Sequence, residues 1–281
     1  MDGKRGLKKT KGFLMRIKLY IVTYRGKERL GVTLKSLFKT SDDRVEINII
    51  NNHSDFEIDK EFQNNVNIIH NSLRPDWSDG HLSRNWNQAI INGFKDLNSP
   101  DCDILVCSQD DSVFQNEWVD NLVKIHENLS FIQNGHGDQF HSYTPDAIKK
   151  IGIWDERFCG IALQAADYFW RSVLFNKDKS SIQDPRHQRV HNPIFPESIQ
   201  LSQNLFVDSD VRLIDQSWSN DKNNEVPIAQ KLIKYKYGYD PYPWTKQKIE
   251  SSKAEFKGLN FITYPYFEKY IEDLVEKNYL I

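Results

Sequence analysis

Short apolar segments alternate with amphipathic segments along the first half of the chain, and this alternation constrains the fold more than any other feature. Residues 16–24 are rich in β-forming side chains and end in a turn-like sequence. Apolar residues then recur at helical spacing between Leu30 and Phe38, and aliphatic residues alternate with polar ones at residues 45–49. Strands that alternate with helices in this way pair in parallel through right-handed crossovers. The sequence therefore predicts an α/β fold.

The pattern continues into the middle of the chain. We expect a third strand at residues 66–70, a helix between Leu82 and Leu97, and a second helix between Trp118 and Leu129. Between these helices, the apolar run at residues 102–107 has the length and composition of a central buried strand. No linker-like segment divides the chain, so one continuous domain is expected, with an irregular C-terminal region.

Two adjacent carboxylates, Asp110 and Asp111, follow this apolar run. Open α/β sheets bind ligands at the carboxyl ends of their strands, and paired carboxylates there are costly unless a cation neutralises them. Mg²⁺ or Mn²⁺ takes few protein carboxylates and leaves positions open for substrate phosphates. The pair therefore indicates a metal site, while a turn or a helix N-cap is the simpler alternative.

Charge and cysteine content narrow the function. A net charge of −2 argues against a general nucleic-acid-binding protein. Seven of the first 18 residues are Lys or Arg, but no apolar segment of membrane-span length follows them. We expect residues 1–15 to form a flexible basic tail, with weak contact to an anionic membrane surface as the alternative. Three cysteines without zinc spacing favour a reducing, cytoplasmic setting.

Known phosphate-binding loops do not fit the sequence. Gly26 and Gly31 have the separation of a P-loop, but Val32 and Thr33 follow in place of the lysine that would reach the phosphates. The first predicted strand is not followed by a dinucleotide-binding glycine pattern. Phosphate binding here would therefore need a metal and basic side chains.

In the order and spacing of its motifs, the chain resembles the GT-A fold glycosyltransferases, especially the large family-2-like group. The resemblance covers roughly residues 16–240. The matching segments, in chain order, are Ile21-Val22-Thr23-Tyr24-Arg25, Asn51-Asn52-His53-Ser54, Leu82-Ser83-Arg84-Asn85-Trp86-Asn87-Gln88-Ala89, Gln109-Asp110-Asp111, Gly152-Ile153-Trp154-Asp155-Glu156-Arg157-Phe158, Asp167-Tyr168-Phe169-Trp170-Arg171 and Lys236-Tyr237-Gly238.

The resemblance implies a GT-A (Rossmann-like), mostly parallel sheet flanked by helices, and an enzyme that moves a sugar from a nucleotide diphosphate sugar to a glycan or glycoconjugate. A UDP-sugar is favoured over a GDP-sugar. By this resemblance Asp111 and His191 would hold Mn²⁺ or Mg²⁺, and Asp110 would support the metal or the ribose. The residues implied around the rest of the donor are Thr23, Tyr24, Arg25, Asn51, Arg84, Asn87 and Lys236.

The residue that activates the acceptor is less clear from the resemblance. Where inverting relatives carry an acidic pair that supplies the general base, this chain has Gln164-Ala165. Asp167 or Asp155 would then stand in as base, or the reaction would retain configuration and the leaving phosphate would take the proton. Among the aromatic residues, Trp77 and Trp154 are the candidates for stacking on an acceptor sugar.

The resemblance also gives an expected domain plan. A donor-binding half would span residues 16–115, an acceptor half residues 116–245, and a helical extension residues 246–281. A further similarity is to glycosyltransferases of large DNA viruses, so a bacterial or virus-infected cytoplasm is expected. The alternatives are a non-catalytic glycan- or nucleotide-binding module with this fold, and a sugar nucleotidyltransferase.

Overall fold

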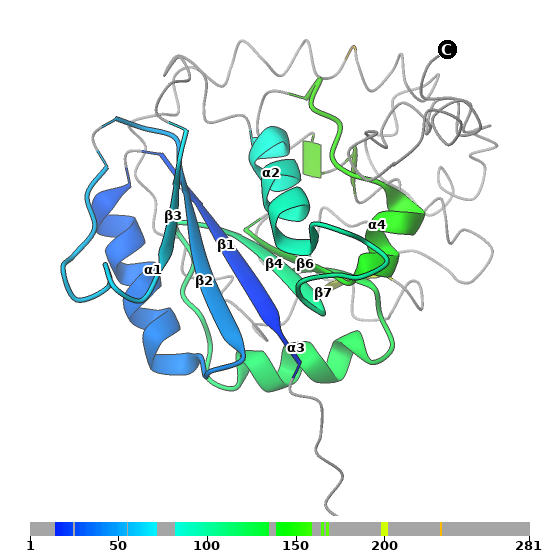
Figure 1. Ribbon diagram of the computed structural model, residues 1–281, viewed down its shortest axis with the longest axis horizontal. Helices are drawn as coiled ribbons and strands as arrows, with labels where there is room; N and C mark the ends of the chain where they lie inside the picture. The colour runs from blue at the N-terminus through cyan, green and yellow to red at the C-terminus, as the bar shows by residue number, and fades with distance from the viewer. Residues whose placement is uncertain are drawn as a thin grey trace, which may run out of the picture.

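A computed structural model of the chain provides the structure (Figure 1). It describes residues 15–24, 26–54, 56–71, 82–134, 139–158, 164–165, 167–168, 198–201 and 231.

The described residues form one seven-stranded sheet with the order β3-β2-β1-β4-β6-β5-β7. The strands are β1 (Ile17–Thr23), β2 (Val45–Asn51), β3 (Asn67–His70), β4 (Ile104–Gln109), β5 (Phe131–Asn134), β6 (Phe140–Tyr143) and β7 (Ser198–Leu201). Neighbouring strands pair in parallel except that β6 runs antiparallel to both β4 and β5. The predicted α/β fold with a mostly parallel sheet is confirmed.

In the described part of the chain, the helices that flank the sheet are α1 (Lys27–Thr40), α2 (Leu82–Phe94), α3 (Trp118–His126) and α4 (Pro145–Ile151). Helix α4 begins with Pro145 after Thr144, because proline fits the first turn where its missing N–H is not needed. The Thr144 side chain does not cap the helix, however. Its hydroxyl instead lies 3.5 Å from the Ser130 carbonyl, at the start of β5.

Alternation along the strands produces two hydrophobic cores, one on each face of the sheet. On one face, Ile17, Leu19 and Ile21 of β1 belong to the cluster that includes residues of α1 and α3. On the other face, Tyr20 and Val22 belong to the cluster that includes residues of α2 and α4. Helices on both faces are what a parallel sheet requires, because its strands are buried on both sides.

The close approach of α2 to β4 depends on Gly93. A Cβ at this position would lie 2.3 Å from Cδ1 of Leu105, so a larger residue would require the Leu105 side chain or the helix to shift. Cys102 and Cys107 are buried in the same core as free thiols. Burial raises the pKa of Cys102 to about 12, so this cysteine is a packing residue rather than a nucleophile or metal ligand.

Several expectations lie outside the described residues. They include the basic tail at residues 1–14 and the helical extension expected at residues 246–281. In the described part of the chain, no helix is both long and apolar enough to cross a membrane. The boundaries proposed for the donor and acceptor halves stay predictions.

Candidate functional site

The carboxyl ends of β1, β2 and β4 lie next to one another and form the edge at which the candidate site is built. Thr23 pairs in register with Asn51, and Val22 pairs with Gln109, so Asp110 follows directly beside Thr23. This edge is at the top of Figure 1, near the N-terminal end of α2. The sheet thus places side by side the residues that the sequence motifs single out from three separate segments.

Asp110 is held by side chains at the end of β1 and in the first two turns of α1. The Thr23 hydroxyl donates to one carboxylate oxygen at 2.7 Å, and Nε of Arg29 donates to the other at 3.3 Å. The Thr33 hydroxyl also donates to the main-chain carbonyl of Asp110 at 2.9 Å. The strand end of β4 is therefore tied to the first two turns of α1.

The electrostatics of Asp110 set it apart from the surface acids. The side chain belongs to a residue that is only 7% exposed. Burial raises its pKa to about 6 and Asp111 raises it too, whereas Arg29 and Thr23 lower it. A buried carboxylate with a raised pKa at the end of a parallel strand is typical of a functional site rather than of a turn.

Gly26 allows the chain to pass close to this carboxylate. A Cβ on Gly26 would lie 2.0 Å from Oδ2 of Asp110 and 2.8 Å from Nη2 of Arg29. Glycine is therefore required here by close approach and not by a left-handed backbone, since its φ is −109°. The sequence indicated a turn at Gly26 and a P-loop-like spacing to Gly31, and neither pattern revealed this close approach to Asp110.

The loop that carries Asp111 is held from β6. The Gln139 side chain donates to the main-chain carbonyl of Asp111 at 3.1 Å. The Ser108 hydroxyl donates to the Gln139 carbonyl at 3.0 Å, and its oxygen lies 2.9 Å from Ser112 Oγ. Asp111 itself is 7% exposed. Gln139 gave no sequence signal, because its part in the site depends on the antiparallel pairing of β6 with β4.

Asn51 shapes the turn after β2. Its Oδ1 accepts the His53 main-chain N–H at 3.0 Å, and its Nδ2 donates to the His53 carbonyl at 2.7 Å and lies 3.2 Å from Nδ1 of His70. His53 in turn makes an edge-on ring contact with Tyr24 at 5.3 Å. The side chain implied as a contact of the nucleobase is thus engaged in its own turn, and it acts on the site by fixing that turn.

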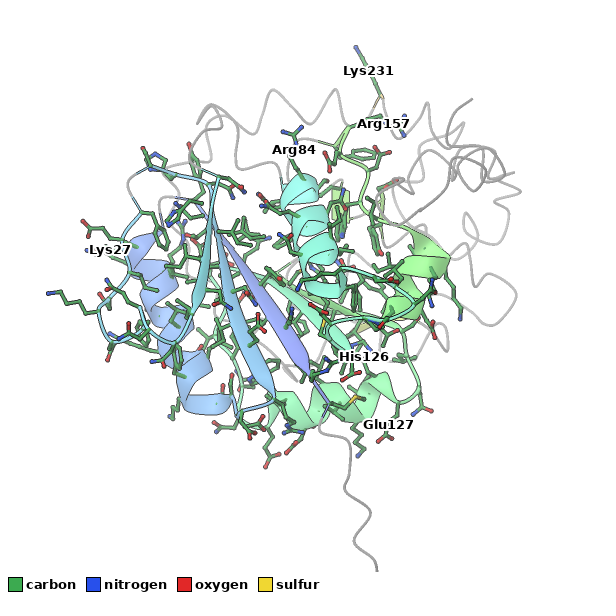
Figure 2. All side chains as sticks on the ribbon, in the orientation of Figure 1. Lys27, Arg84, His126, Glu127, Arg157 and Lys231 are labelled. Carbon is green, nitrogen blue, oxygen red and sulfur yellow. The ribbon has the colours of Figure 1, made fainter. Side chains whose placement is uncertain are left out.

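Helix α2 holds the segment at residues 152–158 through Asn87 and Arg84. The Asn87 amide accepts the Trp154 main-chain N–H at 2.7 Å and donates to the Trp154 carbonyl at 2.9 Å and to Glu156 at 3.0 Å. Arg84 donates to Glu156 at 3.2 Å. Asn87 therefore positions a neighbouring segment, whereas the partly exposed head of Arg84 lies at the N-terminal end of α2 (Figure 2).

The two candidate bases are both buried. Asp155 is 3% exposed and accepts hydrogen bonds from the main-chain N–H and the guanidinium of Arg157, the shortest at 2.6 Å. Asp167 is 1% exposed, and Ala165, two residues before it in the sequence, is also buried. The Arg157 side chain, which Asp155 orients, is 45% exposed.

Trp154 is not available to stack on an acceptor sugar, so that prediction is wrong. The residue is 1% exposed, stacks on Tyr168 with ring centroids 4.5 Å apart, and donates from Nε1 to the Tyr143 hydroxyl at 2.8 Å. The sequence suggested exposure because Trp154 has an acidic neighbour. In the folded chain its polar N–H is satisfied internally, which permits full burial.

Four predicted residues, Arg25, Trp77, His191 and Lys236, lie outside the described residues. Within the described part, no group of three or more His, Cys, Asp or Glu side chains is arranged to hold a metal ion. A donor-bridging Mg²⁺ or Mn²⁺ needs only one or two carboxylates, with phosphate oxygens and water completing its coordination. The chemistry of the pair Asp110 and Asp111 fits such an ion.

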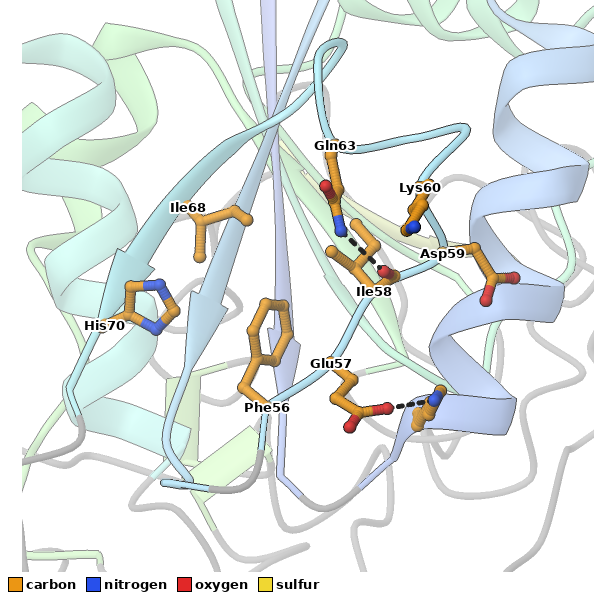
Figure 3. A pocket seen from close by; sticks show the side chains of 9 residues that line it. Phe56, Glu57, Ile58, Asp59, Lys60, Gln63, Ile68 and His70 are labelled. Atoms are coloured by element: carbon orange, nitrogen blue, oxygen red, sulfur yellow. Dashed lines mark hydrogen bonds and ion pairs between the residues drawn. The ribbon is translucent and has the colours of Figure 1, made fainter.

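A groove of about 680 Å³ lies beside the site, between the edge strand β3, the segment that follows β2 and the start of α1 (Figure 3). Its lining residues are Lys27, Phe56, Glu57, Ile58, Asp59, Lys60, Gln63, Ile68 and His70. Two lysines balance two acids there, and Lys27 pairs with Glu57. Balanced charge makes the groove a poor site for a diphosphate.

Comparison with known proteins gives structural matches alone. No family model and no curated protein sequence matches the chain. TarS from S. aureus (residues 1–349) matches 88% of this chain and 72% of its own, at 11% identity and a TM-score of 0.48. The mannosyltransferase PcManGT from Pyrobaculum calidifontis, solved with GDP-Man and Mn²⁺, matches 91% of this chain and 74% of its own, at 10% identity and a TM-score of 0.49.

A third solved structure matches a shorter part of the chain. It is glucosyl-3-phosphoglycerate synthase from Mycobacterium tuberculosis in complex with Mn²⁺, UDP and glucosyl-3-phosphoglycerate. The match covers 49% of this chain and 59% of the synthase, at 11% identity and a TM-score of 0.35. At these identities and TM-scores the similarity is one of overall shape.

Proposed function

We propose that the chain is a metal-dependent glycosyltransferase that moves a sugar from a nucleotide diphosphate sugar to a hydroxyl of a glycan or glycoconjugate. The observation that carries this proposal is the buried carboxylate pair, Asp110 and Asp111, at the carboxyl edge of a mostly parallel sheet. The chain has no glycine-rich phosphate loop after its first strand, so a cation is the natural partner for a diphosphate here. A UDP-sugar is favoured over a GDP-sugar.

Mn²⁺ or Mg²⁺ would be held by Asp111, with Asp110 beside it and His191 as a further proposed ligand. Such an ion neutralises negative charge that develops on a departing nucleoside diphosphate, and this lowers the barrier. Thr23 fixes the orientation of Asp110 through its hydroxyl. Burial of both acids excludes water and strengthens their interaction with any bound cation.

Cationic side chains at the same edge would meet the phosphates. Arg84 and Arg157 are candidates, because both are partly exposed and each is already oriented by an acidic partner. Arg25 and Lys236 are proposed to join them. Thr23, Tyr24 and the turn built by Asn51 would surround the nucleoside. Asn87 would contribute indirectly, by holding the segment at residues 152–158 in place.

The step that deprotonates the acceptor separates two stereochemical outcomes. A general base must come within hydrogen-bond reach of the acceptor hydroxyl. Asp155 and Asp167 are both buried, so inversion requires one of them to become accessible when the acceptor binds. Retention requires neither, because the leaving phosphate takes the proton. The anomeric configuration of the product, read by NMR, decides between these outcomes.

Asp111→Ala tests the metal site most directly. We expect this change to lower the affinity for UDP or GDP in the presence of Mn²⁺ at least a hundredfold, because alanine has no oxygen atom that could coordinate the ion. Binding is measured by calorimetry with and without Mn²⁺, and circular dichroism checks the fold. Turnover is measured as hydrolysis of a panel of nucleotide sugars.

Asp120→Ala is the matched control, because Asp120 is an acid on α3 whose side chain is 72% exposed and pairs with Arg44. It should leave nucleotide binding unchanged. Equal affinities of the Asp111 variant and the wild type would remove Asp111 from the site. Tight metal-dependent binding with no turnover of any nucleotide sugar would favour the non-catalytic module.

A further inference from the structure

We propose that Arg29 makes the binding of a divalent cation depend on the nucleotide donor. Arg29 neutralises the charge of Asp110 until the diphosphate of the donor binds. This inference rests on the proposed function. It assigns to Arg29 a role in coupling the cation to the nucleotide, and it makes Arg29 a positioning residue for the site.

The position of Arg29 supports this role. The residue lies in the first turn of α1, and its side chain is only 14% exposed. Its Nε donates to Oδ1 of Asp110 at 3.3 Å, and its Nη2 donates to the Tyr24 main-chain carbonyl at 3.2 Å. The guanidinium therefore connects the turn after β1 with the carboxylate after β4. Gly26 leaves the space that this connection needs, since a Cβ there would lie 2.8 Å from Nη2.

The local charge explains why a free cation would bind weakly. Asp110 and Asp111 together carry two negative charges when ionised, and Arg29 offsets one of them. A divalent cation that enters the site before the donor therefore meets one net negative charge instead of two. It also meets a like charge on Arg29 at close range, in a partly buried place where such repulsion is little screened.

A diphosphate changes this balance. Its oxygens offer the guanidinium a second partner with which arginine pairs well, often through two parallel hydrogen bonds. It also brings the negative charge that the cation lacks. Once Arg29 pairs with phosphate, both oxygens of Asp110 can act on the cation, while Thr23 continues to hold the carboxylate. Cation and donor then strengthen each other's binding by the same factor, as linkage requires.

Arg44 provides a matched comparison at the opposite end of the sheet. It is also a largely buried arginine, with its side chain 19% exposed, and it pairs with two acids, Asp42 and Asp120. Those acids are 42% and 72% exposed, and neither lies at the strand ends that carry the site. Removing the charge of Arg44 should therefore affect neither ligand.

The experiment measures binding of Mn²⁺ alone, UDP alone and GDP alone, and of each nucleotide with saturating Mn²⁺, by calorimetry at pH 8, well above the pKa of Asp110. For the wild type we expect Mn²⁺ to improve nucleotide affinity at least tenfold. For Arg29→Gln we expect Mn²⁺ alone to bind about tenfold more tightly and the improvement to fall below threefold. Arg29→Lys keeps the charge and should leave the affinity for Mn²⁺ alone within about threefold of wild type.

Two outcomes separate the failures. If the wild type binds neither Mn²⁺ with nucleotide nor a nucleotide alone, both the proposed function and this inference are wrong. If the wild type shows the coupling but Arg29→Gln leaves it unchanged, or weakens binding of Mn²⁺ alone, only the inference is wrong. Thermal melting of each variant and of Arg44→Gln shows whether a change in affinity reflects a change in folding.

Discussion

The two ends of the central sheet differ in the exposure of their charged and polar side chains. At the amino ends of β1, β2 and β4, Arg16 pairs with Asp103, Lys95 with Asp101 and Arg44 with two acids, and most of these side chains are well exposed. At the carboxyl ends, Thr23, Asn51, Asp110 and Asp111 are between 1% and 7% exposed. The same strands thus carry solvated ion pairs at one end and buried polar groups at the other.

The difference matters because the two kinds of interaction have different energetic consequences. Exposed ion pairs contribute little, typically about 0–1 kcal/mol, since water and salt screen them. Buried carboxylates cost free energy unless they are hydrogen-bonded and neutralised. The buried acid pair of this chain therefore lowers the stability of the fold at the end of the sheet where we propose that the ligand binds. We expect substitutions at the two ends to differ accordingly.

The largest effect is expected from Gly26→Ala. The added methyl group would overlap the Asp110 carboxylate and force it away from Thr23. We expect a loss of about 1–3 kcal/mol in the free energy of unfolding, as for other overpacked sites, together with at least a tenfold loss of Mn²⁺-dependent nucleotide affinity. Urea denaturation and calorimetry measure the two quantities.

Gly31→Ala is the control for this change. Gly31 lies within α1, and a Cβ there would have Oδ2 of Asp59 at 3.7 Å as its nearest neighbour, which is an ordinary contact. Alanine should stabilise the helix by up to about 1 kcal/mol and leave binding unchanged. Similar results for both glycine variants would mean that the Gly26 turn is not tightly packed against Asp110.

A smaller effect of opposite sign on stability is expected from Asp110→Asn. The pKa of Asp110 lies at about 6 in the folded protein against an ordinary value of 3.8, with burial as the main cause. A folded pKa above the unfolded value means that this group favours folding most below pH 4, and that the benefit is lost as the pH rises through 6. At pH 7 its ionisation therefore costs stability, at most about 3 kcal/mol.

Asparagine removes that ionisation but leaves Arg29 without its anionic partner, which offsets part of the gain. We expect the variant to be about 1–2 kcal/mol more stable than wild type at pH 7, with a smaller difference at pH 4, and to bind Mn²⁺ with nucleotide less tightly. Urea denaturation at the two pH values gives the comparison. A stability difference between the variant and wild type that is smaller at pH 7 than at pH 4 would contradict the expected cost of ionising the buried Asp110.

The smallest effect is expected at the amino end. Arg44→Gln removes a pairing with Asp42 and Asp120, whose side chains are exposed. We expect a loss below about 1 kcal/mol that shrinks further in 0.5 M salt, with no change in nucleotide affinity. Thermal melts at low and high salt measure it. A large, salt-independent loss would show that this end also depends on buried charge.

Much of the fold could be predicted because its signals are local. Alternating apolar residues indicated β1 and β2, helical spacing indicated α1 and α2, and an apolar run indicated β4. Strand β6 was missed because Phe140-His141-Ser142-Tyr143 is short and does not alternate. All four residues are buried through contacts with distant strands, and no local pattern carries that information.

The candidate site was predictable in part. The motifs indicated Thr23, Asn51 and Asp110, and the structure brings them to one edge. The roles of Asn51 and Asn87 could not be read from the sequence, because an amide that contacts a ligand and an amide that holds a loop have the same chemistry. Trp154 was assigned to the surface because of its acidic neighbour, whereas its partners lie on other elements.

The sequence by itself determined the layered α/β architecture and the place where two carboxylates end a central strand, since both follow from the period and length of neighbouring segments. Only the tertiary structure decided what surrounds those carboxylates. Arg29 lies 81 positions from Asp110, and Gln139 lies 28 positions from Asp111. Contacts of this separation depend on how strands pair and helices pack, so the charge balance of the site is a property of the fold.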